Sequence, residues 1–367
     1  MRYGAWRLLV LAATALCQER WEPRYLYDAD DSELVLNDLA FASPLRGLGC
    51  GALRENRRER PVFLLTLDGG RNWTLRDAPD VCLSLFFPDE NTAWMVGRKG
   101  LYQGREAGSS WRRVPAPPDL LQVFFLDQQR GWAVGMRKAV YATADGGASW
   151  RRLPAAEEPK TNPDHTAYVW ITFADAQRGM IVGGSRPPRR DEQRRLPDWL
   201  DPERARRRRE WPSLGIVLET RDGGQSWSAS VTTMFGQITR VRLAPDGRGL
   251  ALVEFALAFE WPSEVFSLNW KSGRSERAFR RADRLVTDVA LTPDGWGYLA
   301  AVEPVGQTIR LPVPGKVHVL RSRDLVRWEE TEVDYRAYGR RAVFAQAPEG
   351  GLWLATDAGV VLERVGQ

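Results

Sequence analysis

The sequence predicts an all-β fold: a single seven-bladed β-propeller of four-stranded antiparallel blades, whose ring is closed by the N- and C-terminal strands. Two repeating motifs and the composition support this prediction. The chain of 367 residues contains 16 Trp and 33 Gly, a combination typical of many short strands joined by tight turns. The motifs recur at intervals of about 40 residues, which is the length of one propeller blade.

The first motif is an octapeptide in which Thr, Asp, two Gly and a final Trp keep fixed positions. Asp-Gly and Gly-Gly pairs allow the positive φ angles of a tight hairpin, and the Asp side chain can accept hydrogen bonds from the turn. The Trp that ends the motif can pack over the turn and cover its own sheet. Three copies are complete and two are degenerate: Thr66–Trp73, Thr143–Trp150 and Thr220–Trp227, then Gly104–Trp111 and Ser322–Trp328.

The second motif is a short apolar strand flanked by Gly, which keeps step with the octapeptide. Its clearest copy is the Gly-Trp-Ala-Val-Gly segment Gly131–Gly135, and related segments are Gly47–Gly51, Thr92–Gly97 and Gly179–Gly183. Each unit is therefore expected to contain an apolar strand, the Gly-flanked strand, a third strand, the octapeptide turn and a fourth strand that begins at the Trp.

Seven such units fit the chain. The first four end at Trp residues of the octapeptide, and the seventh has only three strands, so segment 21–27 is expected to supply its fourth. Closing the ring in this way leaves no open sheet edge. The strands expected in the last three units are Val241–Leu243, Leu250–Phe255, Val265–Trp270 and Arg277–Phe279; Leu285–Leu291, Trp296–Val302, Lys316–Arg321 and Trp328–Val333; and Ala342–Gln346, Leu352–Thr356 and Val360–Val365.

Residues 1–17 have the pattern of a signal peptide for export. Arg2 and Arg7 flank the start, an apolar run continues to Leu16, and small residues provide a cleavage site. The predicted mature protein is one propeller over residues 21–367, located in the periplasm or outside the cell, with membrane association as one alternative. Cys17 would be the lipidated residue of a lipoprotein, but Leu16 stands where a small residue is expected, so lipidation stays open.

Cys50 and Cys82 would remain after cleavage, either as a disulfide or as two buried thiols on neighbouring strands. The composition also excludes several function classes. Two His and three Cys cannot form a Cys- or His-rich zinc cluster, no apolar stretch is long enough to span a membrane, and the usual nucleotide-binding and zincin motifs are missing. We therefore predict no cofactor and no metal. A nucleic-acid partner is not predicted either, because no aromatic platform alternates with the Arg residues.

The octapeptide resembles the Asp-box (BNR) repeat, Ser/Thr-x-Asp-x-Gly-x-Ser/Thr-Trp. Together with the Gly-Trp-Ala-Val-Gly strand, it makes the chain similar to the photosystem II stability/assembly factor family of seven-bladed propellers, over most of residues 35–227 and weakly beyond. The resemblance implies an exported, non-enzymatic scaffold that binds a protein partner, such as a nascent membrane protein or membrane complex. Asp-boxes also occur in sialidases and xyloglucan-cleaving hydrolases, so the alternative is a secreted glycan-binding or sialidase-like propeller.

The defining residues of the octapeptide are expected to be structural, because equivalent turns of separate blades surround the ring and do not converge. They are Asp68, Trp73, Asp145, Trp150, Asp222 and Trp227. A sialidase would also place Arg-Ile-Pro before the first box, and that tripeptide is absent. The strands expected to line the channel are largely apolar, with Asp288 as one of few acids, which argues against an enzyme. No catalytic residue is therefore predicted.

The loops that join the second and third strands of the first four units are basic. These loops should share one face with the crossovers between blades, opposite the octapeptide turns. The fourth loop is an Arg-rich insertion at about 185–213, and residues 186–210 hold 10 Arg and 6 acidic residues. Because Arg pairs readily with carboxylates, this face is predicted to bind the protein partner. The predicted binding residues are Arg54, Arg57, Arg58, Arg60, Arg98, Lys99, Arg137, Lys138, Arg189, Arg190, Arg194, Arg195, Arg206, Arg207, Arg208 and Arg209.

Overall fold

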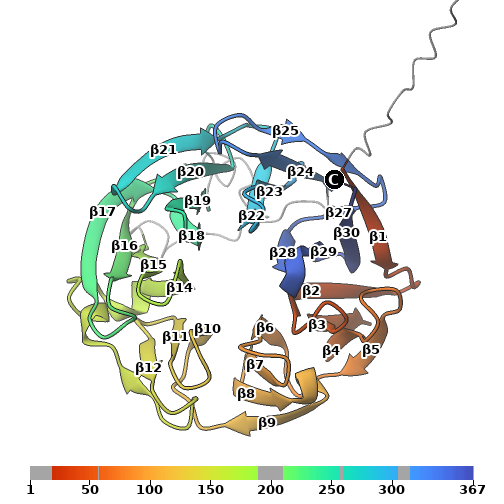
Figure 1. Ribbon diagram of the computed structural model, residues 1–367, viewed down its shortest axis with the longest axis horizontal. Helices are drawn as coiled ribbons and strands as arrows, with labels where there is room; N and C mark the ends of the chain where they lie inside the picture. Colours follow the sequence, from red (N-terminus) through yellow and green to blue (C-terminus); the bar gives the residue numbers. More distant parts are fainter. Residues whose placement is uncertain (1–18, 57, 189–209, 257–258, 305–314, 367) are drawn as a thin grey trace, which may run out of the picture.

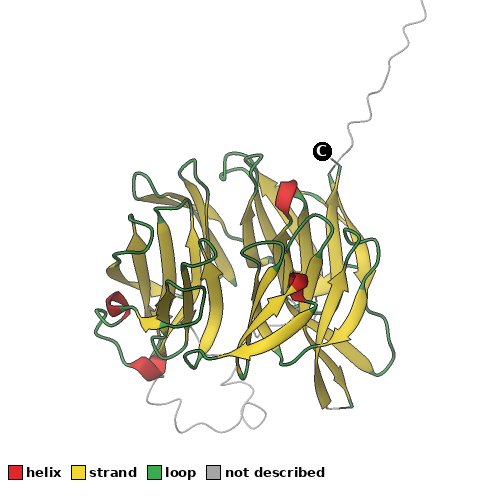
Figure 2. Ribbon diagram, turned by 60° about the horizontal axis from the view of Figure 1, so that its bottom comes forward, coloured by secondary structure: helices red, strands yellow, loops and turns green. Residues whose placement is uncertain are grey.

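The computed structural model describes residues 19–56, 58–188, 210–256, 259–304 and 315–366. Seven antiparallel sheets stand around a central axis, which confirms the predicted seven-bladed propeller (Figure 1). The first strand of each blade faces the axis, and the later strands follow towards the rim. Figure 2 shows the strands running between two loop-bearing faces. The predicted signal peptide lies outside the described residues.

The first four blades follow the sequence repeat, and their strands pair in sequence order. Short 3-10 turns over Glu106–Gly108, Pro154–Ala156 and Pro163–His165 lie in the connections between strands. The strands are β2 (Ser32–Phe41), β3 (Gly47–Glu55), β4 (Arg58–Thr66) and β5 (Thr74–Asp77) in blade 1; β6 (Cys82–Phe86), β7 (Thr92–Gly97), β8 (Gly100–Arg105) and β9 (Ser110–Val114) in blade 2; β10 (Leu120–Phe125), β11 (Gly131–Gly135), β12 (Val140–Thr143) and β13 (Arg151–Arg152) in blade 3; and β14 (Thr166–Phe173), β15 (Gly179–Ser185), β16 (Pro212–Thr220) and β17 (Ser228–Phe235) in blade 4.

The last three blades form despite their degenerate motifs. The inner strands of blades 6 and 7 are mostly buried between neighbouring blades, whereas that of blade 5 is largely half-buried. A further 3-10 turn, Pro348–Gly350, follows the inner strand of blade 7. The strands are β18 (Gln237–Leu243), β19 (Arg248–Glu254), β20 (Ser263–Asn269) and β21 (Arg274–Phe279) in blade 5; β22 (Leu285–Leu291), β23 (Gly297–Val302), β24 (Gly315–Ser322), β25 (Glu329–Glu330) and the short β27 (Tyr338–Gly339) in blade 6; and β28 (Ala342–Gln346), β29 (Leu352–Thr356) and β30 (Val360–Val365) in blade 7.

The two ends of the chain close the ring as predicted. Strand β1 (Arg20–Leu26) pairs antiparallel with β30 and completes blade 7. One expected strand, 328–333, is split between two blades. Its first part is β25 of blade 6, and its second part, β26 (Glu332–Val333), pairs in parallel with β1. This segment therefore joins the last blade to the closing strand.

The two sequence motifs meet at the interfaces between blades. Trp132, from the Gly-flanked strand of blade 3, packs against Phe173 of blade 4 with ring centroids 4.8 Å apart and ring planes tilted by 32°, and it meets Trp227 edge-on at 6.0 Å. A Cβ atom on Gly224, the second Gly of the octapeptide turn in blade 4, would lie 2.0 Å from the Trp132 ring. The turn therefore needs Gly both for its positive φ of 82° and for the Trp of the preceding blade.

The same interlock recurs at two other interfaces. In each, a Trp from the second strand of one blade stacks on a Phe of the next blade, and the octapeptide Trp of that next blade meets the same Phe edge-on. The sets are Trp353, Phe41, Trp73 and Gly70 between blades 7 and 1, and Trp94, Phe125, Trp150 and Gly147 between blades 2 and 3. This interlock explains why the two motifs keep step along the sequence.

The Asp residues of the three complete octapeptides hold their own turns. In the Asp145 turn, a carboxylate oxygen accepts the Thr143 hydroxyl at 2.8 Å and the Ser149 N–H at 2.9 Å. The Ser149 hydroxyl also donates to this carboxylate and, with the backbone N–H, lowers the pKa of Asp145 to about 2; Ser226 does the same for Asp222. The Asp68 turn has the same pattern, with Asn72 in place of Ser. These carboxylates stabilise the octapeptide turns, which is the structural role expected from their spacing.

Candidate functional site

A cavity of about 630 Å³ opens at one end of the channel, on the face of the loops between second and third strands. Arg54, near the end of β3 in blade 1, and Arg98, in the β7–β8 loop of blade 2, line it together with Arg340 and Arg341 from the crossover into blade 7. The loops between second and third strands and the crossovers therefore share one face, as predicted. We call this cavity the channel mouth.

A β-bulge at the same place in six inner strands shapes the channel mouth. The register shifts by one residue in each of these strands, so the residue after the bulge turns towards the axis. The six residues after the bulges all line the cavity: Asp38, Ser84, Gln122, Trp170, Arg240 and Asp288. They form a polar ring inside otherwise apolar strands.

Three members of this ring accept a backbone N–H from a neighbouring blade. Asp38 accepts the backbone N–H of Leu85 in blade 2 at 2.8 Å. Gln122 likewise accepts Ile171 of blade 4 at 2.7 Å, and Asp288 accepts Phe344 of blade 7 at 2.9 Å. Each of the two carboxylates also accepts the N–H of the residue that follows it. Both carboxylates are thus held by backbone donors, a use that fits interblade links better than acid–base catalysis.

A pair of arginines flanks the ring residue Trp170. The guanidinium carbons of Arg240 and Arg242 lie 4.4 and 4.6 Å from the centre of the indole, within the range of cation–π attraction. The indole N–H donates to the carbonyl of Val241 at 2.8 Å, which fixes the ring in place. Burial lowers the pKa of Arg240 to about 10, so its guanidinium remains charged at neutral pH.

Cations outnumber carboxylates among the described residues that line the channel mouth. Six Arg face four acids. The Arg are Arg54, Arg98, Arg240, Arg242, Arg340 and Arg341, and the acids are Asp38, Glu254, Asp288 and Asp357.

Two acids beside the cavity hold the arginines of its rim. Glu59 pairs with Arg98 and lies 3.4 Å from Arg54, and the hydrogen bond from Arg98 lowers its pKa. Glu33 accepts Arg340 at 2.7 Å and reaches Arg54 only at 3.7 Å. Arg54 therefore has only long ion pairs and is 46% exposed. Arg341 is similar, with Glu254 at 3.7 Å and an exposure of 41%.

The channel carboxylate Asp38 gives the molecule a pH dependence. Burial raises its pKa to about 6, despite the N–H donors and nearby Arg240. The folded state therefore binds a proton at Asp38 more tightly than the unfolded chain does. The stability that this bound proton contributes is lost as pH rises from about 4 to about 6. The effect is on the order of 3 kcal/mol, from about 2 pKa units at 1.36 kcal/mol each.

Urea unfolding of the parent and of Asp38→Asn between pH 4 and pH 7 measures this effect. Other carboxyl groups titrate alike in the two proteins and cancel in the difference. We expect the parent to lose stability relative to Asp38→Asn as pH rises through this window. A difference that is constant from pH 4 to pH 7 would contradict the raised pKa.

The remaining predicted binding residues are dispersed. Lys99 is exposed beside Arg98, whereas Arg60 pairs with Asp77 on the outer strand β5. Arg58 is exposed in β4, and Arg137 pairs with Asp164 at 2.7 Å. Arg57, Arg189, Arg190, Arg194, Arg195, Arg206, Arg207, Arg208 and Arg209 lie outside the described residues, as does most of the Arg-rich insertion.

Lys138 is wrong as a surface binding residue. It is 3% exposed, and its ammonium donates to the carbonyl of Pro159 at 2.7 Å and lies 3.7 Å from Glu157. Both partners belong to the long crossover before blade 4, which folds over the Met136–Lys138 turn. The length of the crossover 154–166 predicts that it emerges on this face, but its irregular pattern does not show that it covers Lys138.

Four arginines of the channel mouth were not predicted: Arg240, Arg242, Arg340 and Arg341. A signal for the first two exists in the alternation of segment 237–243, which places Arg240 and Arg242 on one face of an inner strand. Asp38 was also missed, so the channel holds two carboxylates where Asp288 was expected to be nearly alone.

Among the described residues, no group of three or more His, Cys, Asp and Glu could hold a metal ion. No helix in the same residues is long and apolar enough to cross a membrane.

Comparison with known proteins gives matches among solved structures. YCF48 bound to D1 peptide is 17% identical, with 95% of this chain and 96% of that one covered and a TM-score of 0.61. The chain shares the propeller fold of YCF48. YCF48 from Cyanidioschyzon merolae is 14% identical over 94% of this chain and 98% of that one, with a TM-score of 0.56.

An enzyme shares the architecture as well. An ancestral GH74 enzyme is 15% identical over 76% of this chain and 35% of that one, with a TM-score of 0.51. No protein-family model and no curated protein sequence matches the chain. At these identities the likeness concerns the fold alone, so function has to be argued from the site.

Proposed function

We propose that this chain is an exported, non-enzymatic scaffold that binds a carboxylate-bearing segment of a protein partner at the channel mouth. The observation that carries the proposal is the excess of Arg over acid among the described residues of the 630 Å³ cavity. The structure of YCF48 bound to D1 peptide supports a protein segment as the ligand of such a propeller. The Cys50–Cys82 disulfide supports export, since disulfides persist in oxidising compartments.

The arrangement of the rim supports binding of an added carboxylate. Arg54 and Arg341 keep N–H donors that the long pairs of Arg54 with Glu33 and Glu59, and of Arg341 with Glu254, do not use well. Glu59 holds Arg98 in place, so part of the rim is ordered before a partner arrives. Ordering in advance lowers the entropy cost of binding.

The double variant Arg54→Ser/Arg341→Ser tests the proposal. Losing two charge-assisted contacts should weaken partner binding roughly tenfold or more. The measurement is a cross-linking pull-down from native membranes and periplasm, followed by titration of the identified partner. The matched control is Arg71→Ser/Arg221→Ser, which removes the same charge from exposed octapeptide turns on the opposite face. Equal binding by both variants would overturn the channel mouth as the binding site.

The alternative is a glycan-directed propeller. It is favoured by the two carboxylates and the indole of Trp170 in one cavity, and by the fold shared with a GH74 enzyme. The backbone donors on Asp38 and Asp288 argue against it. Turnover of sialylated or xyloglucan oligosaccharides that disappears in Asp38→Asn would favour this alternative over the scaffold.

A further inference from the structure

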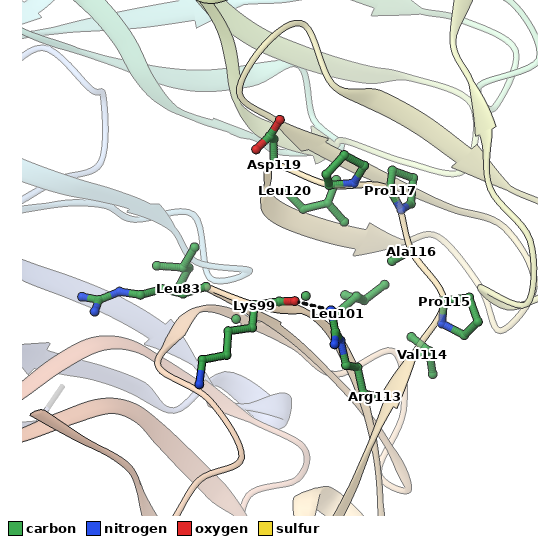
Figure 3. A pocket seen from close by; sticks show the side chains of 14 residues that line it. Leu83, Lys99, Leu101, Arg113, Val114, Pro115, Ala116, Pro117, Asp119 and Leu120 are labelled. Atoms are coloured by element: carbon green, nitrogen blue, oxygen red, sulfur yellow. Dashed lines mark hydrogen bonds between the residues drawn. The ribbon is translucent and has the colours of Figure 1, made fainter.

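A second cavity, of about 620 Å³, lies between blades 2 and 3 on the same face as the channel mouth. Its lining comes from the β7–β8 loop, the end of β9 and the crossover into β10 (Figure 3). Leu83 and Arg98 line both this cavity and the channel mouth. The two are therefore adjacent parts of one recessed surface, and we call the second cavity the trough.

The trough has an apolar floor and a rigid wall. Leu101 and Leu120 are buried beneath it, while Val114 and Ala116 remain half-exposed along its side. The wall is the crossover 115–118, in which three of four residues are Pro. Proline fixes φ and offers no N–H, so this wall keeps its shape and Ala116 has its only backbone N–H. Side chains therefore supply most of the donors that a ligand would meet here.

Two cations at one end of the trough make no ion pair within the described part of the chain: Lys99 and Arg113. Arg113 donates one N–H to the carbonyl of Lys99 at 2.6 Å, which holds its guanidinium beside the trough and leaves other N–H groups available. The N–H of Lys99 donates to the buried Asp80 at 2.6 Å, which fixes the loop. Asp119 lies at the opposite end, as Figure 3 shows.

We propose that the trough binds an extended segment of the protein partner that carries an apolar residue beside an acidic one. The apolar side chain would cover Val114 and Ala116, and the carboxylate would pair with Lys99 and Arg113. From there the segment would pass Arg98 into the channel mouth. This inference rests on the proposed function and adds to it the chemistry and path of the bound segment. The two cations favour an acidic residue and the apolar floor favours an apolar one. A segment that carries both therefore fits the trough better than a purely anionic ligand.

The test begins with a peptide chosen without bias. A random 12-residue peptide library displayed on phage is selected against the folded full chain, and the selected peptide is the probe. We expect its sequence to contain Asp or Glu beside Leu, Ile, Val or Phe. Binding of the fluorescent peptide is then measured by anisotropy. Changing the acid to its amide, or the apolar residue to Ser, should each weaken binding roughly tenfold.

Protein variants then locate the binding site. Lys99→Ser/Arg113→Ser should weaken the peptide roughly tenfold or more, and Ala116→Trp should do so by filling the trough without a change of charge. The matched control is Arg105→Ser/Arg112→Ser, on the same blade but outside the trough, which should leave binding unchanged. Thermal melting confirms that each variant is folded.

The outcomes separate this inference from the proposed function. Weaker peptide binding by Lys99→Ser/Arg113→Ser and by Ala116→Trp supports the trough as the binding site. A peptide that is weakened only by Arg54→Ser/Arg341→Ser would overturn the trough and leave the channel mouth as the site. If the peptide binds equally well after its apolar residue is changed to Ser, the trough recognises charge alone, and the inference is overturned. No selected peptide at all would overturn both.

Discussion

Removing the Cys50–Cys82 disulfide is expected to lower the free energy of unfolding by about 4 kcal/mol. The two cysteines are 32 residues apart in sequence, and a cross-link that closes a loop of this size restricts the unfolded chain by about that much. Cys50 lies in β3 of blade 1 and Cys82 in β6 of blade 2, and both are fully buried. The bond thus joins two neighbouring blades covalently, beside the hydrogen bond from Asn37 to the carbonyl of Cys82.

Denaturation by guanidinium chloride measures this effect in the parent, with and without reductant, and in Cys50→Ser/Cys82→Ser. The reductant should destabilise the parent and leave the double variant unchanged. Thiol titration of the unfolded parent should find the two cysteines unreactive until reductant is added. Equal stability of the parent with and without reductant would contradict the expected contribution.

The disulfide is an example of a feature that the sequence alone leaves undecided. The cysteine count left a disulfide and buried thiols equally open, because their choice depends on which strands of neighbouring blades face each other. Propeller closure was predictable, because the seventh unit lacked a strand and segment 21–27 was left over. The split of segment 328–333 between two sheets was not, since both halves have the same extended pattern.

The candidate site was predictable only in part. Loops between second and third strands must share a face in any such blade, so Arg54 and Arg98 were found from connectivity alone. Arg340 and Arg341 stand in a crossover, and nothing local shows that it bends towards the axis. Asp38 and Arg240 face the axis because a bulge precedes them, and a one-residue shift of register cannot be read from an apolar strand.

The interlock between blades should be the most sensitive part of the fold. Trp132→Ala is expected to cost about 3–5 kcal/mol, because it empties a buried site that a Phe, a Trp and a Gly of blade 4 enclose. Gly224→Ala should also be costly, since the new Cβ atom would overlap the Trp132 ring and the backbone has a positive φ.

A double-mutant cycle separates these two causes. Gly273→Ala is the matched control, because Gly273 has a positive φ of 70° but no neighbour within 4 Å of an added Cβ. It should cost only the strain of a left-handed backbone, about 1–2 kcal/mol. Gly224→Ala should cost clearly more than this in the parent, and about the same as the control once Trp132 is Ala. Urea unfolding of the four proteins in the cycle measures the coupling. If Gly224→Ala costs the same with and without the indole, the two motifs are not energetically linked, and their common spacing along the chain needs another physical cause.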